Sequence, residues 1–147
     1  MINIPTIFGK KTAAPERPSD IDNVPCHVAV IMDGNRRWAE RRKLPKVAGY
    51  KYALESLRDI YNTCLETGIK YLTIYAFSTE NKFRPKDEVK YLEWLLVEAI
   101  NTEIRTLAEK NVKVRFLGRM QEVEKTSLDK IREIEDATAK NSALNLQ

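Results

Sequence analysis

The sequence predicts an α/β fold in which a parallel sheet is flanked by helices. Short runs rich in apolar and β-branched residues alternate along the chain with longer segments whose apolar residues recur every three or four positions. Four strands and three helices alternate in this way, a pattern typical of parallel strands joined by right-handed helical crossovers. In such a sheet the ligand site is expected beyond the carboxyl ends of the strands.

The predicted elements follow a leader. Residues 1–24 carry prolines and scattered charges without periodicity, so we expect a flexible leader there and one folded domain over 25–147. Gly68 is expected to cap the first helix. Strands are expected at 27–32, 70–77 and 112–117, with a fourth beginning at 143, and helices at 49–67, 87–110 and 121–138.

The helix predicted over 87–110 has a continuous apolar stripe. Such a stripe is typical of a helix that faces the core. It would also suit the wall of an apolar tunnel for a long hydrocarbon chain, and the spacing leaves both interpretations open. The stripe consists of Val89, Leu92, Leu96, Ile100, Ile104 and Leu107.

Composition excludes several classes of protein. No apolar run approaches the roughly 20 residues that a membrane span needs, and the first residues lack the positive leader of a signal peptide. The single histidine, His27, lies inside a predicted strand, which excludes histidine-rich metal sites. Cys26 and Cys64 match no metal or redox spacing, so we expect reduced thiols in the cytoplasm.

The positive charge is concentrated in one segment. The whole chain has a net charge of +4. Between Asp33 and Lys46 six basic residues stand against two acidic ones, an excess equal to that of the whole chain. The remainder is therefore close to neutral, and the positive field gathers where a phosphate group or a polyanion would bind.

The first predicted strand ends in a set of residues that suits diphosphate chemistry. Asp33 follows the strand directly, where a carboxylate can hold Mg²⁺, and Gly34 lets the backbone approach an anion closely. Arg36 and Arg37 supply charged donors for diphosphate oxygens. A strand-to-helix turn with solvated arginines would show the same pattern, so both interpretations stay open.

The second predicted strand also ends in polar residues. Ser78, Asn81 and Arg84 follow it, and taken alone they are typical of an ordinary helix-capping turn. Because the two strand ends are expected side by side at one sheet edge, together they favour a functional site. A third strand end, at residues 118–119, holds fewer polar groups.

Two stretches of the sequence are similar to signatures of a known family. HVAVIMDGNRRWA at 27–39 resembles the opening signature of the cis-prenyltransferases. YAFSTEN at 75–81, with Arg84-Pro85 and Glu88-Val89 after it, resembles the second signature at the expected distance. The resemblance runs from about Val24 to the last residue, with further similarity at 111–118 and 135–146.

The resemblance implies a Mg²⁺-dependent transferase that condenses isopentenyl diphosphate with an allylic diphosphate, making polyprenyl diphosphate of the undecaprenyl type. It implies that Asp33 holds the Mg²⁺ and assists departure of the allylic diphosphate. Asn81 stands where the family's proposed proton acceptor lies, but an amide is a weak base, so we expect Asn81 to orient groups while diphosphate or water takes the proton. The residues implied to bind substrate are Gly34, Asn35, Arg36, Arg37, Trp38, Lys46, Tyr50, Ser78, Thr79, Glu80, Lys82 and Arg84.

The chain departs from the family pattern at four positions. Arg36 stands at a usual glycine, an accepted variant, and Lys82 replaces a usual tryptophan. Lys46 replaces an arginine, which keeps the charge but loses the bidentate fork. Tyr50 replaces a histidine. A tyrosine can donate one hydrogen bond, but it cannot take up and release a proton at neutral pH as a histidine can.

The resemblance covers only the N-terminal part of the family's domain. The family continues with a Tyr-Gly-Gly-Arg segment and a later segment, rich in arginine and serine, that binds isopentenyl diphosphate and adds a metal-binding glutamate. The 147 residues contain neither. We therefore expect a cis-prenyltransferase-like fold that is C-terminally incomplete and holds the allylic half of an active site. An inactive fragment or a non-catalytic prenyltransferase-like subunit remains the alternative.

Two other classes of protein share parts of the pattern. An aspartyl phosphotransferase also places an acid after its first strand, but it normally has a second aspartate where this chain has Asn35. A nucleic-acid-binding module could use the basic segment, but the clustered exposed aromatics of single-strand binders are missing. We therefore expect no nucleic-acid partner. The resemblance further implies a homodimer in the cytoplasm, peripheral at the membrane, where its product resides.

Overall fold

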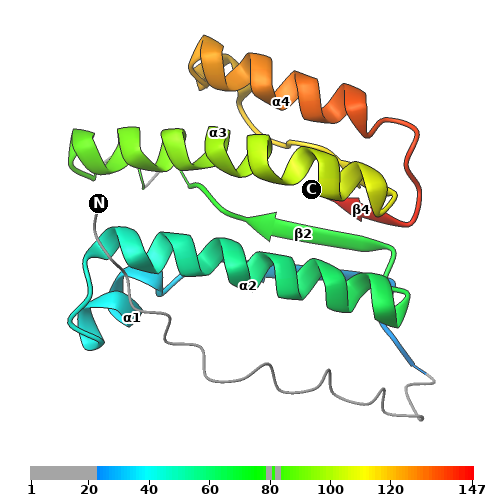
Figure 1. Cartoon of the computed structure of the whole chain (residues 1–147), viewed down its shortest axis with the longest axis horizontal. Helices are drawn as coiled ribbons and strands as arrows, with labels where there is room; N and C mark the ends of the chain where they lie inside the picture. Colours follow the sequence, from blue (N-terminus) through cyan, green and yellow to red (C-terminus); the bar gives the residue numbers. More distant parts are fainter. Residues whose placement is uncertain (1–22, 79–80, 82–83) are drawn as a thin grey trace.

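The computed structural model describes residues 23–78, 81 and 84–147. Among these residues four strands form one parallel sheet, ordered β1-β2-β4-β3 (Figure 1). The predicted class of fold, a parallel sheet flanked by helices, is confirmed. The strands are β1 (His27–Ile31), β2 (Tyr71–Tyr75), β3 (Val112–Val114) and β4 (Leu144–Leu146). The leader predicted over 1–24 lies, except for its last two residues, outside the described part of the chain.

Long helices connect the strands, as the apolar periodicity predicted. Gly68 caps α2 at φ 83°, a left-handed conformation that a glycine adopts without the strain of a side chain. Short α1, which follows β1, was not delimited by the sequence. The helices are α1 (Asn35–Arg41), α2 (Lys46–Thr67), α3 (Lys86–Glu109) and α4 (Lys125–Ala137).

The core lies between alternate strand residues and the inner sides of the long helices. Leu72, Val112 and Leu144 have no exposed area, and burying each such side chain contributes about 1.5–3 kcal/mol. Ile100 and Leu107 of the α3 stripe belong to this cluster, with Leu96 and Ile104 packed against it. For these four residues the interpretation as core is confirmed. No helix among the described residues combines the length and apolar character that crossing a membrane requires.

The third strand and the helix after it differ from their predicted bounds. β3 ends at Val114, although the Arg115 N–H still donates to the Leu146 carbonyl of β4 (2.8 Å). On the outer side of this edge strand, side chains near the end of α4 accept the backbone N–H groups: Val114 donates to Thr138 Oγ1 (3.0 Å) and Phe116 to Glu135 Oε1 (2.8 Å). The helix predicted over 121–138 is divided into the 3₁₀ turn η2 (Met120–Glu122) and α4, because Val123 between them is extended.

The register of β1 against β2 brings the two polar strand ends together. The strands pair in parallel from His27 opposite Tyr71 to Ile31 opposite Tyr75. The ladder continues beyond β1, since the Met32 N–H donates to the Tyr75 carbonyl (3.1 Å). Parallel strands end at the same edge of a sheet, so Asp33 and Ser78 follow their strands on one side of the molecule.

Candidate active site

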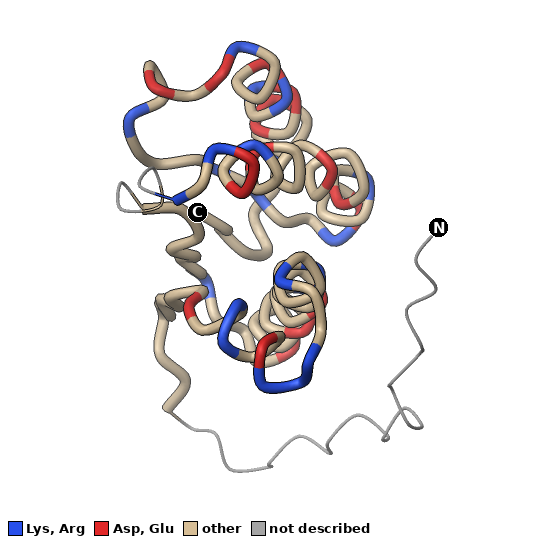
Figure 2. The backbone as a smooth tube through the Cα atoms, turned by 90° about the vertical axis from the view of Figure 1, so that its left-hand side faces the viewer, with Lys and Arg blue, Asp and Glu red and all other residues tan. Residues whose placement is uncertain are grey.

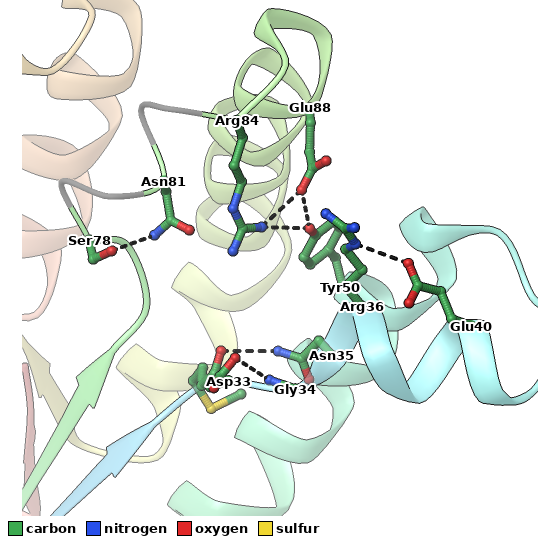
Figure 3. Close-up of polar contacts among 11 residues, drawn as sticks. Asp33, Gly34, Asn35, Arg36, Glu40, Tyr50, Ser78, Asn81, Arg84 and Glu88 are labelled. Carbon is green, nitrogen blue, oxygen red and sulfur yellow. Dashed lines mark hydrogen bonds and ion pairs between the residues drawn. The ribbon is translucent and has the colours of Figure 1, made fainter.

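The turn after β1 is built around a glycine with positive φ. Gly34 begins α1 at φ 84° and ψ −4°, a conformation that costs an L side chain about 1–3 kcal/mol. Its N–H donates to Asp33 Oδ1, and the Asn35 amide donates to the Met32 carbonyl (3.2 Å). The turn therefore fixes the backbone from which the Asp33 carboxylate projects (Figure 3).

Two ion pairs order the arginines of α1. Arg37 Nη2 lies 3.0 Å from Asp33 Oδ2, and Arg36 Nε lies 3.0 Å from Glu40 Oε1. The Asp33 and Arg37 side chains are 74% and 68% exposed, so this pair contributes little to stability and both groups are accessible to a ligand. Glu40 raises the pKa of Arg36 through its hydrogen bond, which keeps that guanidinium charged.

Gly49 on α2 makes the close approach of α1 possible. A Cβ atom at Gly49 would lie 2.2 Å from the Asn35 carbonyl oxygen and 2.8 Å from its carbon. Both atoms belong to the backbone and cannot rotate away as a side chain could. The first turn of α1, and with it the Asp33 turn, is therefore held directly on α2.

A triangle of hydrogen bonds joins the second strand end to α2 and α3. Tyr50 Oη donates to Glu88 Oε1 (2.7 Å), and Arg84 Nη1 donates to Tyr50 Oη (2.8 Å) and to Glu88 Oε1 (2.9 Å) (Figure 3). We call these three residues the site triangle. Burial and the bond to Glu88 raise the pKa of Tyr50 to about 12, while the bonds from Tyr50 and Arg84 lower the pKa of Glu88. At neutral pH the tyrosine is neutral and the glutamate is charged.

The turn and the triangle border one cavity of about 260 Å³. Three arginines, Arg36, Arg37 and Arg84, line it together with two acids, Asp33 and Glu40. Figure 2, in which α1 and the start of α2 face the viewer, shows the basic residues of this region as blue stretches of tube. The described residues that line the cavity are Met32, Asp33, Gly34, Asn35, Arg36, Arg37, Glu40, Tyr50 and Arg84.

A second hollow, of about 270 Å³, adjoins the first and shares Gly34 and Arg37 with it. Trp38 lines this second hollow rather than the first. Its ring packs against Tyr52, with centroids 4.7 Å apart, and the Arg42 guanidinium lies 4.3 Å from its centroid. Trp38 thus stands beside the guanidinium of Arg37 but outside the cavity that holds Asp33.

Asp33, Arg37, Ser78 and Asn81 were expected to converge at one sheet edge; they follow β1 and β2 on the same side, where the structure joins them as two separate pairs. Asn81 Nδ2 donates to Ser78 Oγ (3.1 Å), and neither residue lines the cavity. Arg84, from the described part of the second motif, lines it. Lys46, the first residue of α2, is exposed and lies outside both linings. Of the other predicted site residues, Thr79, Glu80 and Lys82 lie outside the described residues.

The third strand end lies away from the cavity. β4 separates β3 from β2, so residues 118–119 follow the far edge strand of the sheet. Arg119 is paired with Glu122, 3.0 Å away. The sequence marked three strand ends as candidates, and the structure brings together the first two.

Glu88 and Glu40 were missed as site residues. Each is four residues beyond an arginine of the site, Arg84 and Arg36, and each bonds to that arginine. This i,i+4 spacing of opposite charges was visible in the sequence: the Arg36–Glu40 pair lies within α1, whereas Arg84 precedes α3 and pairs with Glu88 in its first turn.

The donor set suits Mg²⁺ bound through one carboxylate. Asp33 offers oxygen ligands at the cavity wall, and Mg²⁺ commonly binds proteins through one or two carboxylates, completing its shell with water and substrate phosphate. Within the described ranges no group of three or more histidine, cysteine, aspartate or glutamate side chains could enclose a metal ion. That arrangement fits a metal that enters with a phosphorylated ligand.

Comparison with known proteins identifies the family. Residues 31–147 match the family model described as "Putative undecaprenyl diphosphate synthase". The chain belongs to this family. Isoprenyl transferases of Clostridium tetani and Heliobacterium mobile are 44% and 46% identical to it over 127 and 140 residues, which are 86% and 92% of this chain. The resemblance inferred from the two motifs is thereby confirmed.

Solved structures of the family share the fold. A probable undecaprenyl diphosphate synthase from Campylobacter jejuni aligns with a TM-score of 0.69 at 30% identity, over 84% of this chain and 53% of its own. Lavandulyl diphosphate synthase from Lavandula x intermedia aligns with a TM-score of 0.79 at 27% identity, over 83% of this chain and 52% of its own. The chain spans about half the length of the curated relatives it matches, 50% for the C. tetani protein and 53% for the H. mobile protein.

The site triangle predicts an unusual tyrosine titration. Burial raises the pKa values of Tyr50 and Tyr61 to about 12 each. Near-ultraviolet absorbance after a rapid pH jump should show two of the six tyrosines ionising near pH 12, and Tyr50→Phe should remove one of them. Both pKa values are raised above 10.0, so the folded protein holds these two protons more tightly than the unfolded chain does. The stability that this preference contributes is complete below pH 10 and is lost as the pH rises through 12. Ionisation of Tyr50 and Tyr61 near the ordinary value of 10.0 would contradict the prediction.

Proposed function

We propose that this chain supplies the allylic diphosphate site of a cis-prenyltransferase, which condenses isopentenyl diphosphate with an allylic diphosphate to lengthen a polyprenyl diphosphate of the undecaprenyl type. The observation that carries the proposal is the cavity at the ends of β1 and β2, which is lined by three arginines and by two acids, Asp33 and Glu40. Membership of the family supports the reaction type. The lavandulyl diphosphate synthase was solved in complex with dimethylallyl diphosphate, which supports an allylic diphosphate as the ligand here.

The charge balance of the cavity suits a diphosphate. Arg36 is balanced by Glu40 and Arg84 by Glu88, so Arg37 is the arginine of the cavity that would lose its partner, and could turn toward a ligand, once Asp33 engages a metal ion. Arginine binds phosphate oxygens through two parallel N–H bonds, which fixes orientation as well as charge. The arginines therefore both retain the ligand and aim it.

Asp33 would hold the Mg²⁺ of this site. When bound, the ion would neutralise negative charge that develops on the diphosphate as its carbon–oxygen bond ionises. Arg37, released from Asp33, would bind oxygens of the diphosphate through its guanidinium group. Positioning and charge neutralisation of this kind supply most of the rate in such ionisations.

Asn81 is proposed as an orienting residue. Its amide Nδ2 already donates to Ser78 Oγ, which sets the direction of the side chain. The amide is too weak a base to accept a proton from the incoming isopentenyl group, so the departing diphosphate or water would take it. Asn81→Asp is the substitution that separates the two roles, because a true base would tolerate it.

The reaction is tested in two steps. Calorimetry of the 147-residue chain with farnesyl diphosphate should show binding that requires Mg²⁺, and farnesol, the matched ligand without phosphate, should not bind. Incorporation of radiolabelled isopentenyl diphosphate should be poor for this polypeptide and should rise when the second half of a relative's sequence is joined to it. One diphosphate site alone forfeits a proximity term of roughly 7–11 kcal/mol.

The outcomes separate the proposal from its alternatives. Binding without transfer in both polypeptides would favour a non-catalytic prenyltransferase-like subunit. Comparable transfer by both would show that these residues hold a complete site. Absence of Mg²⁺-dependent binding would end the proposal, and tight binding to duplex DNA that weakens steeply with salt would replace it with a nucleic-acid partner.

The cellular part of the proposal follows from the product. Each methylene of a polyprenyl chain that enters a bilayer contributes a favourable free energy of about 0.8 kcal/mol, so the product would reside in the membrane. The enzyme would release it at the cytoplasmic surface of that membrane. A homodimer is the assembly proposed. Light scattering of the protein and flotation with lipid vesicles check these two points.

A further inference from the structure

The site triangle has a counterpart elsewhere on the same two helices. Tyr61 Oη donates to Glu103 Oε2 (3.0 Å), and Arg58 Nε donates to Glu103 Oε1 (2.7 Å). Both bonds run to Glu103, and we call these three residues the distant trio. It contains the same three residue types and also joins α2 to α3, but Tyr61 lies about 16 Å further along α2, at roughly 1.5 Å per residue. None of its residues lines the cavity.

The arginine of the site triangle has N–H groups that could still bind a ligand. Both hydrogens of Arg84 Nη1 are used, one on Tyr50 Oη and one on Glu88 Oε1. No described residue accepts a hydrogen bond from its Nε or Nη2 groups, and its side chain is 34% exposed at the cavity. One edge of the guanidinium is thus anchored, while the other points away from Glu88 and is bound by no described residue (Figure 3).

The acceptor of this anchor is largely shielded from solvent. The Glu88 side chain is 11% exposed and stands in the first turn of α3, where the helix dipole favours a negative charge. Tyr50, on α2, accepts from Arg84 and donates to Glu88, so its hydroxyl completes the triangle. Without that hydroxyl, Arg84 would keep a single bond to one oxygen and would rotate about it.

We propose that Tyr50 and Glu88 are positioning residues that hold Arg84 with its free edge toward the diphosphate, so that Tyr50 acts on the ligand through Arg84 and not by touching it. This inference rests on the proposed function, because it takes an allylic diphosphate as the occupant of the cavity. It assigns Glu88 a role in the site and gives Tyr50, which was expected to contact substrate directly, an indirect one.

A double-mutant cycle tests the coupling. Calorimetry with farnesyl diphosphate and Mg²⁺ compares the wild type, Tyr50→Phe, Arg84→Met and the double variant, with Tyr61→Phe as the matched control. Tyr50→Phe is expected to raise Kd about tenfold, in the range of a lost hydrogen bond to a charged group. Tyr61→Phe should change Kd less than about twofold, and in the Arg84→Met background Tyr50→Phe should add less than about twofold.

A second measurement needs no ligand. In ¹⁵N-arginine spectra of the free protein, Arg84 should show slow rotation about its Cζ–Nη1 bond. The rotation should become fast in Tyr50→Phe and in Glu88→Gln, and it should stay slow in Tyr61→Phe. A Tyr50→Phe effect on Kd that persists undiminished in the Arg84→Met background would overturn the inference, as would a freely rotating Arg84 in the wild type. If Tyr50→Phe leaves the affinity for the diphosphate unchanged, the positioning role is refuted and the proposed function stands. If the wild type binds no diphosphate, both the proposed function and the positioning role are refuted.

Discussion

The Gly49→Ala variant is expected to lose about 3 kcal/mol of stability and at least about tenfold in affinity for an allylic diphosphate. Its new methyl group would stand 2.2 Å from the Asn35 carbonyl oxygen, so α1 or α2 must move. Overpacking typically costs about 1–3 kcal/mol, and a backbone obstacle places this case at the upper end. Movement of α1 would carry the Asp33 turn away from the Arg84 side of the cavity.

Gly68→Ala is the matched control for Gly49→Ala. Nothing lies within 4 Å of a Cβ atom there, but φ is +83°, so the cost should be about 1 kcal/mol and come from backbone conformation alone. Urea unfolding measures the two stabilities and calorimetry the two affinities. Equal losses of stability, or an unchanged affinity in Gly49→Ala, would show that α1 tolerates displacement.

The Asp33→Ala variant is expected to lose Mg²⁺-dependent binding of an allylic diphosphate, by about a hundredfold or more in Kd. The carboxylate is proposed to hold the metal ion, and its removal also frees Arg37, which would then bind the diphosphate without metal. Affinity in EDTA should therefore be the same for the variant and the wild type, or slightly higher for the variant.

Asp59→Ala is the control for this loss, because Asp59 is an exposed aspartate on α2 outside both hollows. Calorimetry of each protein with and without Mg²⁺ gives the affinities to be compared. A wild type that binds equally well in EDTA would exclude a metal from the binding step. An Asp33→Ala variant that keeps its Mg²⁺ dependence would place the metal on another residue.

The sequence was most informative where local rules decide the structure. Continuous apolar runs located β1 and β2, and Gly68 located the end of α2, because burial and positive φ restrict which residues can stand there. The order of the strands in the sheet could not be predicted from the sequence. That β4 enters between β2 and β3 depends on the packing of α3 and α4, and no local pattern in residues 144–146 encodes it.

The candidate site divided in the same way. The polar residues at the ends of β1 and β2 could be placed at one edge, because parallel strands share a direction. Which of them line a common cavity depends on side-chain directions between α1, α2 and the start of α3. The Tyr50–Glu88 contact, which joins residues 38 apart in the chain, arises only when α2 packs beside α3.

The position of β4 has a consequence for the order in which the chain folds during synthesis. β1 and β2 can pair as soon as residue 75 has left the ribosome, since they are neighbours in the sheet. β3 cannot join them at once, because β4 lies between β2 and β3 and its backbone bonds to β2 on one side and to β3 on the other. Until residues 144–146 emerge, the nascent chain consists of a paired half and an unpaired strand with an open edge, the state in which a chaperone would find it.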